Sequence, residues 1–264
     1  MNLIIRKVNA LKEFYFFDNF ISLVIQRFLK SRMSFYKKGD LHFITDYDGG
    51  DSTGARHVIS RKLYDEFIII LQNKNVSIQN ILDIGANNGG FVLSLMSQKN
   101  QLKKIVAVEF NYKTYLRLHF NLLYNLSRNI KIEIVNAAAS GNDTIIPTTD
   151  NLGSTGLNIY SKDFGDQELY NVQGYSFNTI YKKYFEGSVI DICKIDIEGA
   201  EYELFYSDNI NNIRHVRFLL IEIHNLPSQN KAELIQKIID FGFDLILPGN
   251  SISPDVYLFE NSII

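Results

Sequence analysis

The chain of 264 residues is 46% hydrophobic and 13% aromatic, which is enough apolar material for one substantial core. Its net charge of −2 gives no overall positive field, and no stretch interleaves basic with aromatic residues, so we expect no nucleic-acid partner. The single cysteine, Cys193, excludes an internal disulfide and indicates a buried thiol in a reducing cytoplasm.

Residues 1–38 mix apolar and basic side chains at roughly helical spacing. Charged residues interrupt every apolar stretch, so we expect no transmembrane span and no signal peptide. A helical cap, a dimer arm and a membrane-surface helix all fit this composition, and docking on the chain's own domain or on a second subunit is favoured. We predict a helical extension over residues 1–75, which caps the substrate site or forms a homodimer, and a main domain over residues 76–264.

Residues 40–60 are rich in Gly, Asp, Ser and Thr and predict a loop, followed by a helix over 61–73. Arg56 and His57 either reach an anionic substrate from this loop or belong to a segment that only caps the helix, and the second interpretation is favoured.

Strands and helices alternate after residue 76. Runs rich in β-branched residues predict strands at 80–85, 104–110 and 130–138, and apolar residues at helical spacing predict helices at 91–100 and 113–126. This alternation is typical of an α/β fold with a parallel sheet and right-handed crossovers.

The second half of the chain departs from that rhythm twice. Residues 141–175, rich in Gly, Asn, Asp, Ser and Thr, predict an irregular, substrate-facing insertion. Residues 243–260 read as two strands joined by a turn, so we expect a closing hairpin and an antiparallel strand at the edge of the sheet.

The segment "ILDIGANNGG" at 81–90 places a glycine turn directly after a strand, where a ligand can meet the backbone. Gly85 and Gly90 fit a dinucleotide fingerprint, but Asn87 holds the middle glycine position and obstructs a pyrophosphate. Asp83 repels an anion and suits a ligand with an amine, such as S-adenosylmethionine. Glu109 ends the next strand, where a carboxylate accepts bonds from ribose hydroxyls in either kind of cofactor.

A second polar cluster follows two later strands. Lys194, Asp196 and Glu198 alternate along one strand and its extension, and Glu222 and His224 do so on the next. Because parallel strands end at the same edge of a sheet, we expect these side chains beside the glycine turn.

At this point the chain resembles the FkbM family of S-adenosylmethionine-dependent methyltransferases. The resemblance covers about residues 80–225 and rests on "LDIGANNGGF", "VAVEFN", "VNAAAS", "KIDIEGAE" and "IEIH", in the family's order. It implies the class I methyltransferase (Rossmann-like) fold, a seven-stranded, mostly parallel sheet with an antiparallel last strand and helices on both faces. Asn178 departs from the pattern, since an Asp is expected there, which puts a local structural or substrate contact in doubt.

The resemblance also implies a set of residues around the cofactor. Phe110 either stacks on adenine or packs in the core at the strand end, and Asn136 is available to the adenine edge. The implied cofactor site is Asp83, Gly85, Asn87, Gly89, Glu109, Phe110, Asn111 and Asn136.

Methyl transfer to a hydroxyl requires alignment together with a base or a metal. His224 is the candidate base, oriented by Glu222 or Asp196, or else a structural histidine. Alternatively, Asp196, Glu198 and Glu222 together with His224 bind Mg²⁺ or Mn²⁺, and Asp196 and Glu222 are the predicted ligands. In a third interpretation these acids pair with Lys194 or cap the next helix. The predicted catalytic set is His224, Asp196, Glu198 and Lys194; Glu201 and Glu203, on the next helix, receive no chemical role.

The resulting functional hypothesis is an O-methyltransferase acting on a hydroxyl of a sugar, nucleotide-sugar or glycan precursor, a substrate class that rests on the resemblance. Two alternatives stay open. One is a nicotinamide-dependent oxidoreductase, which Asn87 opposes, and the other is a catalytically silent methyltransferase-like subunit that binds a partner through its N-terminal helices.

Overall fold

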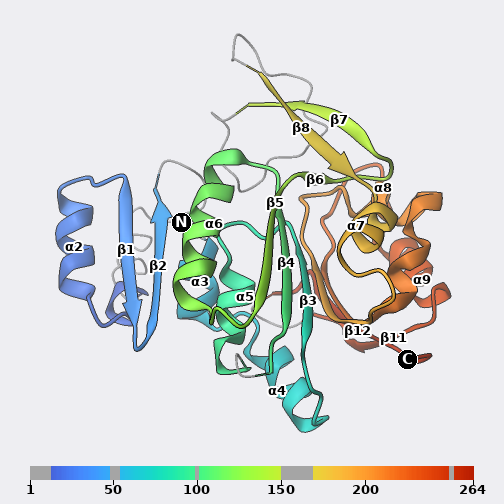
Figure 1. The fold of residues 1–264 in the computed structure, drawn as a ribbon, viewed down its shortest axis with the longest axis horizontal. Helices are drawn as coiled ribbons and strands as arrows, with labels where there is room; N and C mark the ends of the chain where they lie inside the picture. Colours follow the sequence, from blue (N-terminus) through green and yellow to red (C-terminus); the bar gives the residue numbers. More distant parts are fainter. Residues whose placement is uncertain (1–12, 48–53, 99–100, 150–168, 250–252) are drawn as a thin grey trace.

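The computed structural model describes residues 13–47, 54–98, 101–149, 169–249 and 253–264. Within these ranges a seven-stranded sheet forms the centre of the molecule, with a hairpin at its N-terminal side and a small second sheet above it (Figure 1). None of the helices in the described ranges is both long and apolar enough to cross a bilayer.

The central sheet has the strand order β11-β12-β10-β9-β3-β4-β5. Neighbouring pairs among β5, β4, β3, β9 and β10 are parallel, as the alternation of strands and helices predicts. The strands are β3 (Asn80–Ile84), β4 (Lys104–Glu109), β5 (Lys131–Asn136), β9 (Ile190–Ile195), β10 (Val216–Glu222), β11 (Phe243–Leu247) and β12 (Val256–Asn261).

Helices cover both faces of this sheet (Figure 1). Strand side chains alternate between two cores, since Ile81 packs with one layer and Leu82 with the other. The first layer holds α3 (Gly54–Arg61), α4 (Asp65–Asn73), α5 (Gly90–Ser94), the short helix η1 (Leu95–Gln98) and α6 (Tyr112–Asn125). The second holds α7 (Phe177–Tyr184), α8 (Glu201–Tyr206), η2 (Asp208–His215) and α9 (Lys231–Asp240).

The predicted C-terminal hairpin is confirmed, because β11 and β12 pair antiparallel. The prediction that the antiparallel strand lies at the edge is wrong. β12 is inserted between β10 and β11 and pairs antiparallel with both, so β11 forms the edge. Insertion buries both faces of β12, where Leu258 and Phe259 are fully covered.

The N-terminal segment differs from the predicted helix and loop. In the described part of this segment, residues 13–15 and α2 (Phe20–Phe28) are helical, and β1 (Met33–Lys38) and β2 (Leu41–Asp46) form an antiparallel hairpin. Its alternation has period two: Ser34 and Tyr36 are buried and their neighbours exposed. The turn at Gly39, with φ of +56°, needs the conformation that glycine adopts easily.

Two asparagines of α6 hold this hairpin against the main sheet's helical layer. Asn121 accepts from the backbone N–H of Ile44 at 2.8 Å and donates to the Ile44 carbonyl at 3.1 Å. Asn125 pairs in the same way with the backbone of His42. The two amides therefore replace a third strand along the open edge of β2, because an edge strand leaves such groups unpaired. The division into residues 1–75 and 76–264 stays a prediction.

Two further predictions differ from the structure. The predicted loop over 40–60 contains β2 and most of α3, and Lys62, with φ of +56°, separates α3 from α4 inside the predicted helix 61–73. The predicted irregular insertion contains β7 (Thr144–Thr148) and β8 (Tyr170–Tyr175), which form a three-stranded sheet with β6 (Ala138–Ala139). The rest of the insertion, residues 150–168, lies outside the described residues.

Candidate functional site

The glycine turn after β3 brings the backbone of two strands together. Gly85 has φ of +74°, and a Cβ atom at this position would lie 1.8 Å from the carbonyl oxygen of Asp196. The N–H groups of Gly85 and Ala86 both donate to the carbonyl of Val108 at 3.0 Å. Asn87 follows with φ of +49°, so the turn relies on backbone conformations that glycine and asparagine tolerate.

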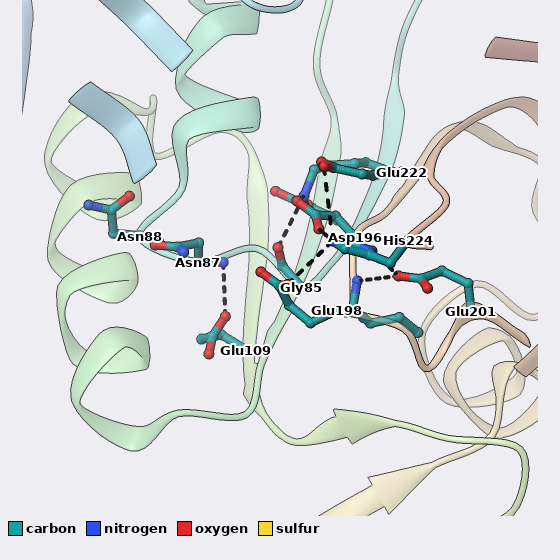
Figure 2. Close-up of polar contacts among 12 residues, drawn as sticks. Gly85, Asn87, Asn88, Glu109, Asp196, Glu198, Glu201, Glu222 and His224 are labelled. Atoms are coloured by element: carbon teal, nitrogen blue, oxygen red, sulfur yellow. Dashed lines mark hydrogen bonds and ion pairs between the residues drawn. The ribbon is translucent and has the colours of Figure 1, made fainter. Parts of the chain in front are cut away.

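A pocket opens between this turn, the end of β4 and the segment after β9. Its wall includes Glu109, whose carboxylate accepts from the backbone N–H of Asn87 at 2.9 Å and of Asn111 at 2.8 Å (Figure 2). These two bonds fix the carboxylate at the pocket wall. The lining residues are Gly85, Asn87, Val108, Glu109, Phe110, Ala137, Ala138, Ala139, Asp196, Ile197, Glu198 and Ala200. We call this cavity the cofactor pocket.

Four of the eight predicted cofactor residues line this pocket: Gly85, Asn87, Glu109 and Phe110. The other four, Asp83, Gly89, Asn111 and Asn136, are not part of its lining.

Asn111 caps α6 by accepting from the Thr114 N–H at 3.1 Å, and Asn136 donates to the carbonyls of Glu109 and Phe110 at 2.9 Å. Gly89 precedes α5 with φ of +93°. Direct cofactor contact by these residues stays a prediction.

Asp83 is the last of the four predicted cofactor residues that do not line the pocket. It is fully buried and sits opposite Lys194 on β9, with 3.7 Å between the Asp83 Oδ1 and the Lys194 ammonium. Burial raises the pKa of Asp83 to about 6, although the ammonium opposes this shift.

Lys194 connects Asp83 with the pocket. Its ammonium donates to the Gly85 carbonyl and to Asp196 Oδ2, both at 3.1 Å. Burial by itself lowers the pKa of Lys194, but the surrounding carboxylates raise it well above its usual value. Lys194 therefore carries a permanent charge that ties the glycine turn to the acidic cluster.

The acidic cluster, formed by Asp196, Glu198 and Glu222, surrounds His224 (Figure 2). The Nε2 atom of His224 lies 3.3 Å from Glu198 Oε2 and 4.0 Å from an oxygen of each of the other two carboxylates. Burial lowers the pKa of His224, but its hydrogen bonds to Glu198 and Glu201 outweigh this and raise it to about 11. Near neutral pH the ring therefore carries a proton on both nitrogens.

Glu201, which received no chemical role from the sequence, fixes the ring from the other side. This fully buried side chain meets His224 Nδ1 at 3.0 Å and accepts from the backbone N–H of Ile197 at 3.0 Å. The contact of Glu201 with the histidine was not predicted. Sequence spacing gives no signal for this contact, because Glu201 and His224 belong to different elements.

Glu222 occupies the end of β10, and one of its carboxylate oxygens lies 4.0 Å from His224 Nε2. Burial raises the pKa of Glu222 to about 7, and the negative charge of Asp196 adds to the shift. Glu222 thus exchanges its proton near neutral pH.

A second pocket adjoins the first and shares Asn87, Asp196 and Glu198 with it. Its wall combines groups from the first helical layer with polar and ionisable groups at the ends of β9 and β10. The lining residues are Gly54, His57, Val58, Leu63, Tyr64, Ala86, Asn87, Gly90, Phe91, Lys194, Asp196, Glu198 and Glu222. We call this cavity the acceptor pocket. Tyr64, a member that the sequence did not indicate, lies at the break between α3 and α4.

Arg56 and His57 contact the N-terminal segment as well as the acceptor pocket's surroundings. Glu13 Oε2 lies 3.2 Å from His57 Nε2 and 3.4 Å from Arg56 Nε, and Glu13 Oε1 accepts from Arg61 Nε at 2.8 Å. His57 is therefore placed between Glu13 and the pocket, whereas Arg56 is buried and does not line it.

The family model described as "Methyltransferase FkbM domain" matches residues 83–245, which is more than half of the chain. The chain belongs to the FkbM methyltransferase family. The predicted family is thus confirmed, and its matched span begins at Asp83 and includes both acidic strand ends. No curated protein matches the chain.

Three solved structures illustrate what this FkbM protein is similar to. The FkbM methyltransferase from Methylobacillus flagellatus KT has a TM-score of 0.50 and 16% identity, and the match covers 70% of this chain but only 44% of that one. The match to a SAM-dependent methyltransferase from Agrobacterium tumefaciens has a TM-score of 0.47 and 10% identity over 87% and 69% of the two chains. The match to magnesium protoporphyrin IX methyltransferase from Synechocystis PCC 6803 has a TM-score of 0.45 and 10% identity, and it covers 81% of this chain and 86% of that one. The predicted α/β fold with a seven-stranded, mostly parallel sheet is confirmed.

The departure at Asn178 has a structural explanation in this FkbM protein. Asn178 lies on α7, and its side-chain oxygen accepts from the backbone N–H of Asn212 in η2 at 2.9 Å. It joins two helices of the second layer and does not line either pocket.

Proposed function

We propose that this protein is an S-adenosylmethionine-dependent O-methyltransferase that acts on a hydroxyl of a sugar, nucleotide-sugar or glycan precursor. The observation that carries the proposal is the shared wall of the two pockets: Asn87, Asp196 and Glu198 belong to both. A methyl donor in one pocket and an acceptor in the other would therefore meet at the acidic cluster.

The cofactor pocket fits a nucleoside with a cationic tail better than a dinucleotide. Glu109 is held in place for ribose hydroxyls, Phe110 offers a ring to adenine, and Gly85 allows the Asp196 backbone to approach the turn closely. Asn87 obstructs a pyrophosphate, and the acids at Asp196 and Glu198 disfavour phosphate but suit an amine or sulfonium. The same features argue against a nicotinamide cofactor.

Bound S-adenosylmethionine supplies an electrophilic methyl group, so the protein has to align the acceptor and remove its proton. The acceptor pocket offers hydrogen-bonding groups on several sides, including His57, Tyr64 and Glu222, among apolar residues such as Phe91. Such a lining suits a polyhydroxylated acceptor, because each hydroxyl requires a partner when it leaves water.

We assign the role of general base to Glu222 instead of His224. An imidazole with a pKa of about 11 has no free lone pair near pH 7, whereas Glu222, with a pKa of about 7, is half ionised there. His224 then acts as a fixed positive charge that holds the three carboxylates together, and Glu201 positions its ring. The ammonium of Lys194 is a second fixed positive charge, and it holds Asp196 by a hydrogen bond.

The sequence also predicts Mg²⁺ or Mn²⁺ with Asp196 and Glu222 as ligands. In the structure one atom each of Asp196, Glu198 and His224 lie within 4.8 Å of one another, a donor set that suits either cation. Activity in a chelator distinguishes the two mechanisms. Full turnover in EDTA supports Glu222 as the base, and turnover that requires added Mg²⁺ or Mn²⁺ assigns the cluster to a cation.

The first experiment is titration calorimetry with S-adenosylhomocysteine and, separately, with NAD. We expect S-adenosylhomocysteine alone to bind. Binding of NAD alone would contradict the proposal. Transfer of a labelled methyl group to a panel of nucleotide sugars then tests the acceptor class, and cofactor binding with no transfer to any hydroxyl compound would favour a silent binding subunit.

A further inference from the structure

Helix α2 presents its apolar side to solvent instead of to the protein. Ile21, Val24, Ile25 and Phe28, at helical spacing, are 62%, 39%, 53% and 86% exposed, and within α2 only Leu23 is buried. Leu29 continues the stripe and is exposed as well. We call these five residues the α2 stripe. Clustered exposed side chains of this size on one helix face indicate a contact surface.

The position of α2 in the fold makes the stripe accessible. The helix lies on the outside of the β1–β2 hairpin, at the side of the molecule away from the central sheet (Figure 1). Gln26 and Asn19 attach this region to the backbone of Phe35 on β1. α2 therefore packs on the chain through Leu23 and leaves the stripe exposed to a further contact.

The exposed charges on α2 and directly after it are positive. Residues 19–39 contain five basic residues and no acidic one, although the whole chain has a net charge of −2; two of the five are paired, Arg32 with Asp46 and Lys38 with Asp18. Arg27 and Lys30 flank the stripe directly, and both are exposed. Two copies of this surface facing each other would bring like charges together, which disfavours self-association.

We propose that the α2 stripe docks this protein on the surface of an anionic lipid bilayer. Apolar side chains such as Phe28 enter the boundary between headgroups and acyl chains, while Arg27 and Lys30 contact the anionic headgroups. A nine-residue helix is about 14 Å long, less than half of the roughly 30 Å hydrocarbon core, so it lies along the surface and does not span it.

Sedimentation with vesicles tests this proposal. Full-length protein is mixed with vesicles of phosphatidylcholine alone or of phosphatidylcholine with phosphatidylglycerol. We expect binding to the anionic vesicles, and a loss of affinity of about tenfold or more in the double variants Ile25→Ser/Phe28→Ser and Arg27→Glu/Lys30→Glu.

Matched controls carry the same changes elsewhere on the surface. Ile69→Ser/Ile239→Ser removes two exposed apolar side chains from other helices, and Lys103→Glu/Lys182→Glu reverses two exposed charges. Both controls should bind anionic vesicles as the unchanged protein does. Thermal melting of every variant confirms that it is folded.

Three results would overturn the proposal. The first is a folded protein that stays in the supernatant with both kinds of vesicle. The second is binding that is unchanged in Ile25→Ser/Phe28→Ser or equally strong on neutral vesicles. The third is a dimer in light scattering that ignores vesicles and becomes monomeric in Ile25→Ser/Phe28→Ser, which would assign the stripe to a second copy of the chain.

Discussion

Gly85 sits where two strand ends approach most closely, and its substitution tests whether the cofactor pocket depends on that approach. In Gly85→Ala the new Cβ would lie 1.8 Å from the Asp196 carbonyl oxygen, so the turn must move. We expect S-adenosylhomocysteine affinity to fall by about a hundredfold or more, measured by calorimetry. Gly187→Ala is the matched control: its φ of +75° imposes the same strain, and nothing lies within 4 Å of its Cβ. Equal affinity in both variants would contradict this role of Gly85.

Glu222 offers a second test at the scale of single residues. If it is the base, the rate of methyl transfer rises with pH with a midpoint near 7 and levels off at higher pH, because the carboxylate must be ionised to accept the proton. Glu222→Gln should lower kcat by about a hundredfold and remove this pH dependence, with little change in the KM for the methyl donor. A profile with the same midpoint in the variant would show that another group titrates.

At the scale of secondary-structure elements, the N-terminal hairpin depends on the asparagines of α6. Asn121 bonds both backbone groups of Ile44 and also donates to the Asn88 carbonyl at 2.8 Å, next to the glycine turn. Asn121→Ala leaves these buried groups without partners, so we expect the free energy of unfolding to fall by about 2 to 3 kcal/mol. Amide hydrogen exchange at Ile44 should accelerate. Leu116→Ala, on the exposed side of the same helix, should change neither quantity appreciably.

The elements that the sequence predicted are those whose pattern is local. The strands around Ile81, Val106 and Ile192 are recognisable because parallel strands with two buried faces are rich in β-branched residues. The β1–β2 hairpin was missed because "MSFYKKGDLHFITD" is short and mixed, and its edge is completed by Asn121 and Asn125 about 80 residues away. The position of β12 inside the sheet likewise depends on pairing with β10, which no local pattern contains.

At the scale of the whole molecule, the candidate site could be predicted in part. The convergence of the glycine turn and the two acidic strand ends follows from the rule that parallel strands share a carboxyl edge, and the structure places Asp196, Glu222 and His224 together there. The protonation of His224 could not be predicted, since it results from Glu198 and the buried Glu201 acting together. The pairing of Asp83 with Lys194 could not be predicted either, because it depends on the register between β3 and β9.

Glu13 attaches the N-terminal segment to α3 and gives a stability prediction for the whole chain. Burial alone raises its pKa, but bonds to His57 and Arg61 together with the charges of His57 and Arg56 lower it from 4.5 to about 2. A carboxyl with a lowered pKa stabilises the fold at pH values above its unfolded pKa, and this contribution is lost as the pH falls from about 4.5 to about 2.

We therefore expect Glu13→Gln to lower the free energy of unfolding at pH 7 by about 2 to 3 kcal/mol, because Arg56 and its neighbours lose their carboxylate partner. The difference from the unchanged protein should shrink steadily below pH 4.5, in urea unfolding followed by circular dichroism. Glu186→Gln, at an exposed position, is the control and should behave as the unchanged protein at every pH. A difference that stays constant down to pH 2 would show that Glu13 stabilises the chain through packing, not through its charge.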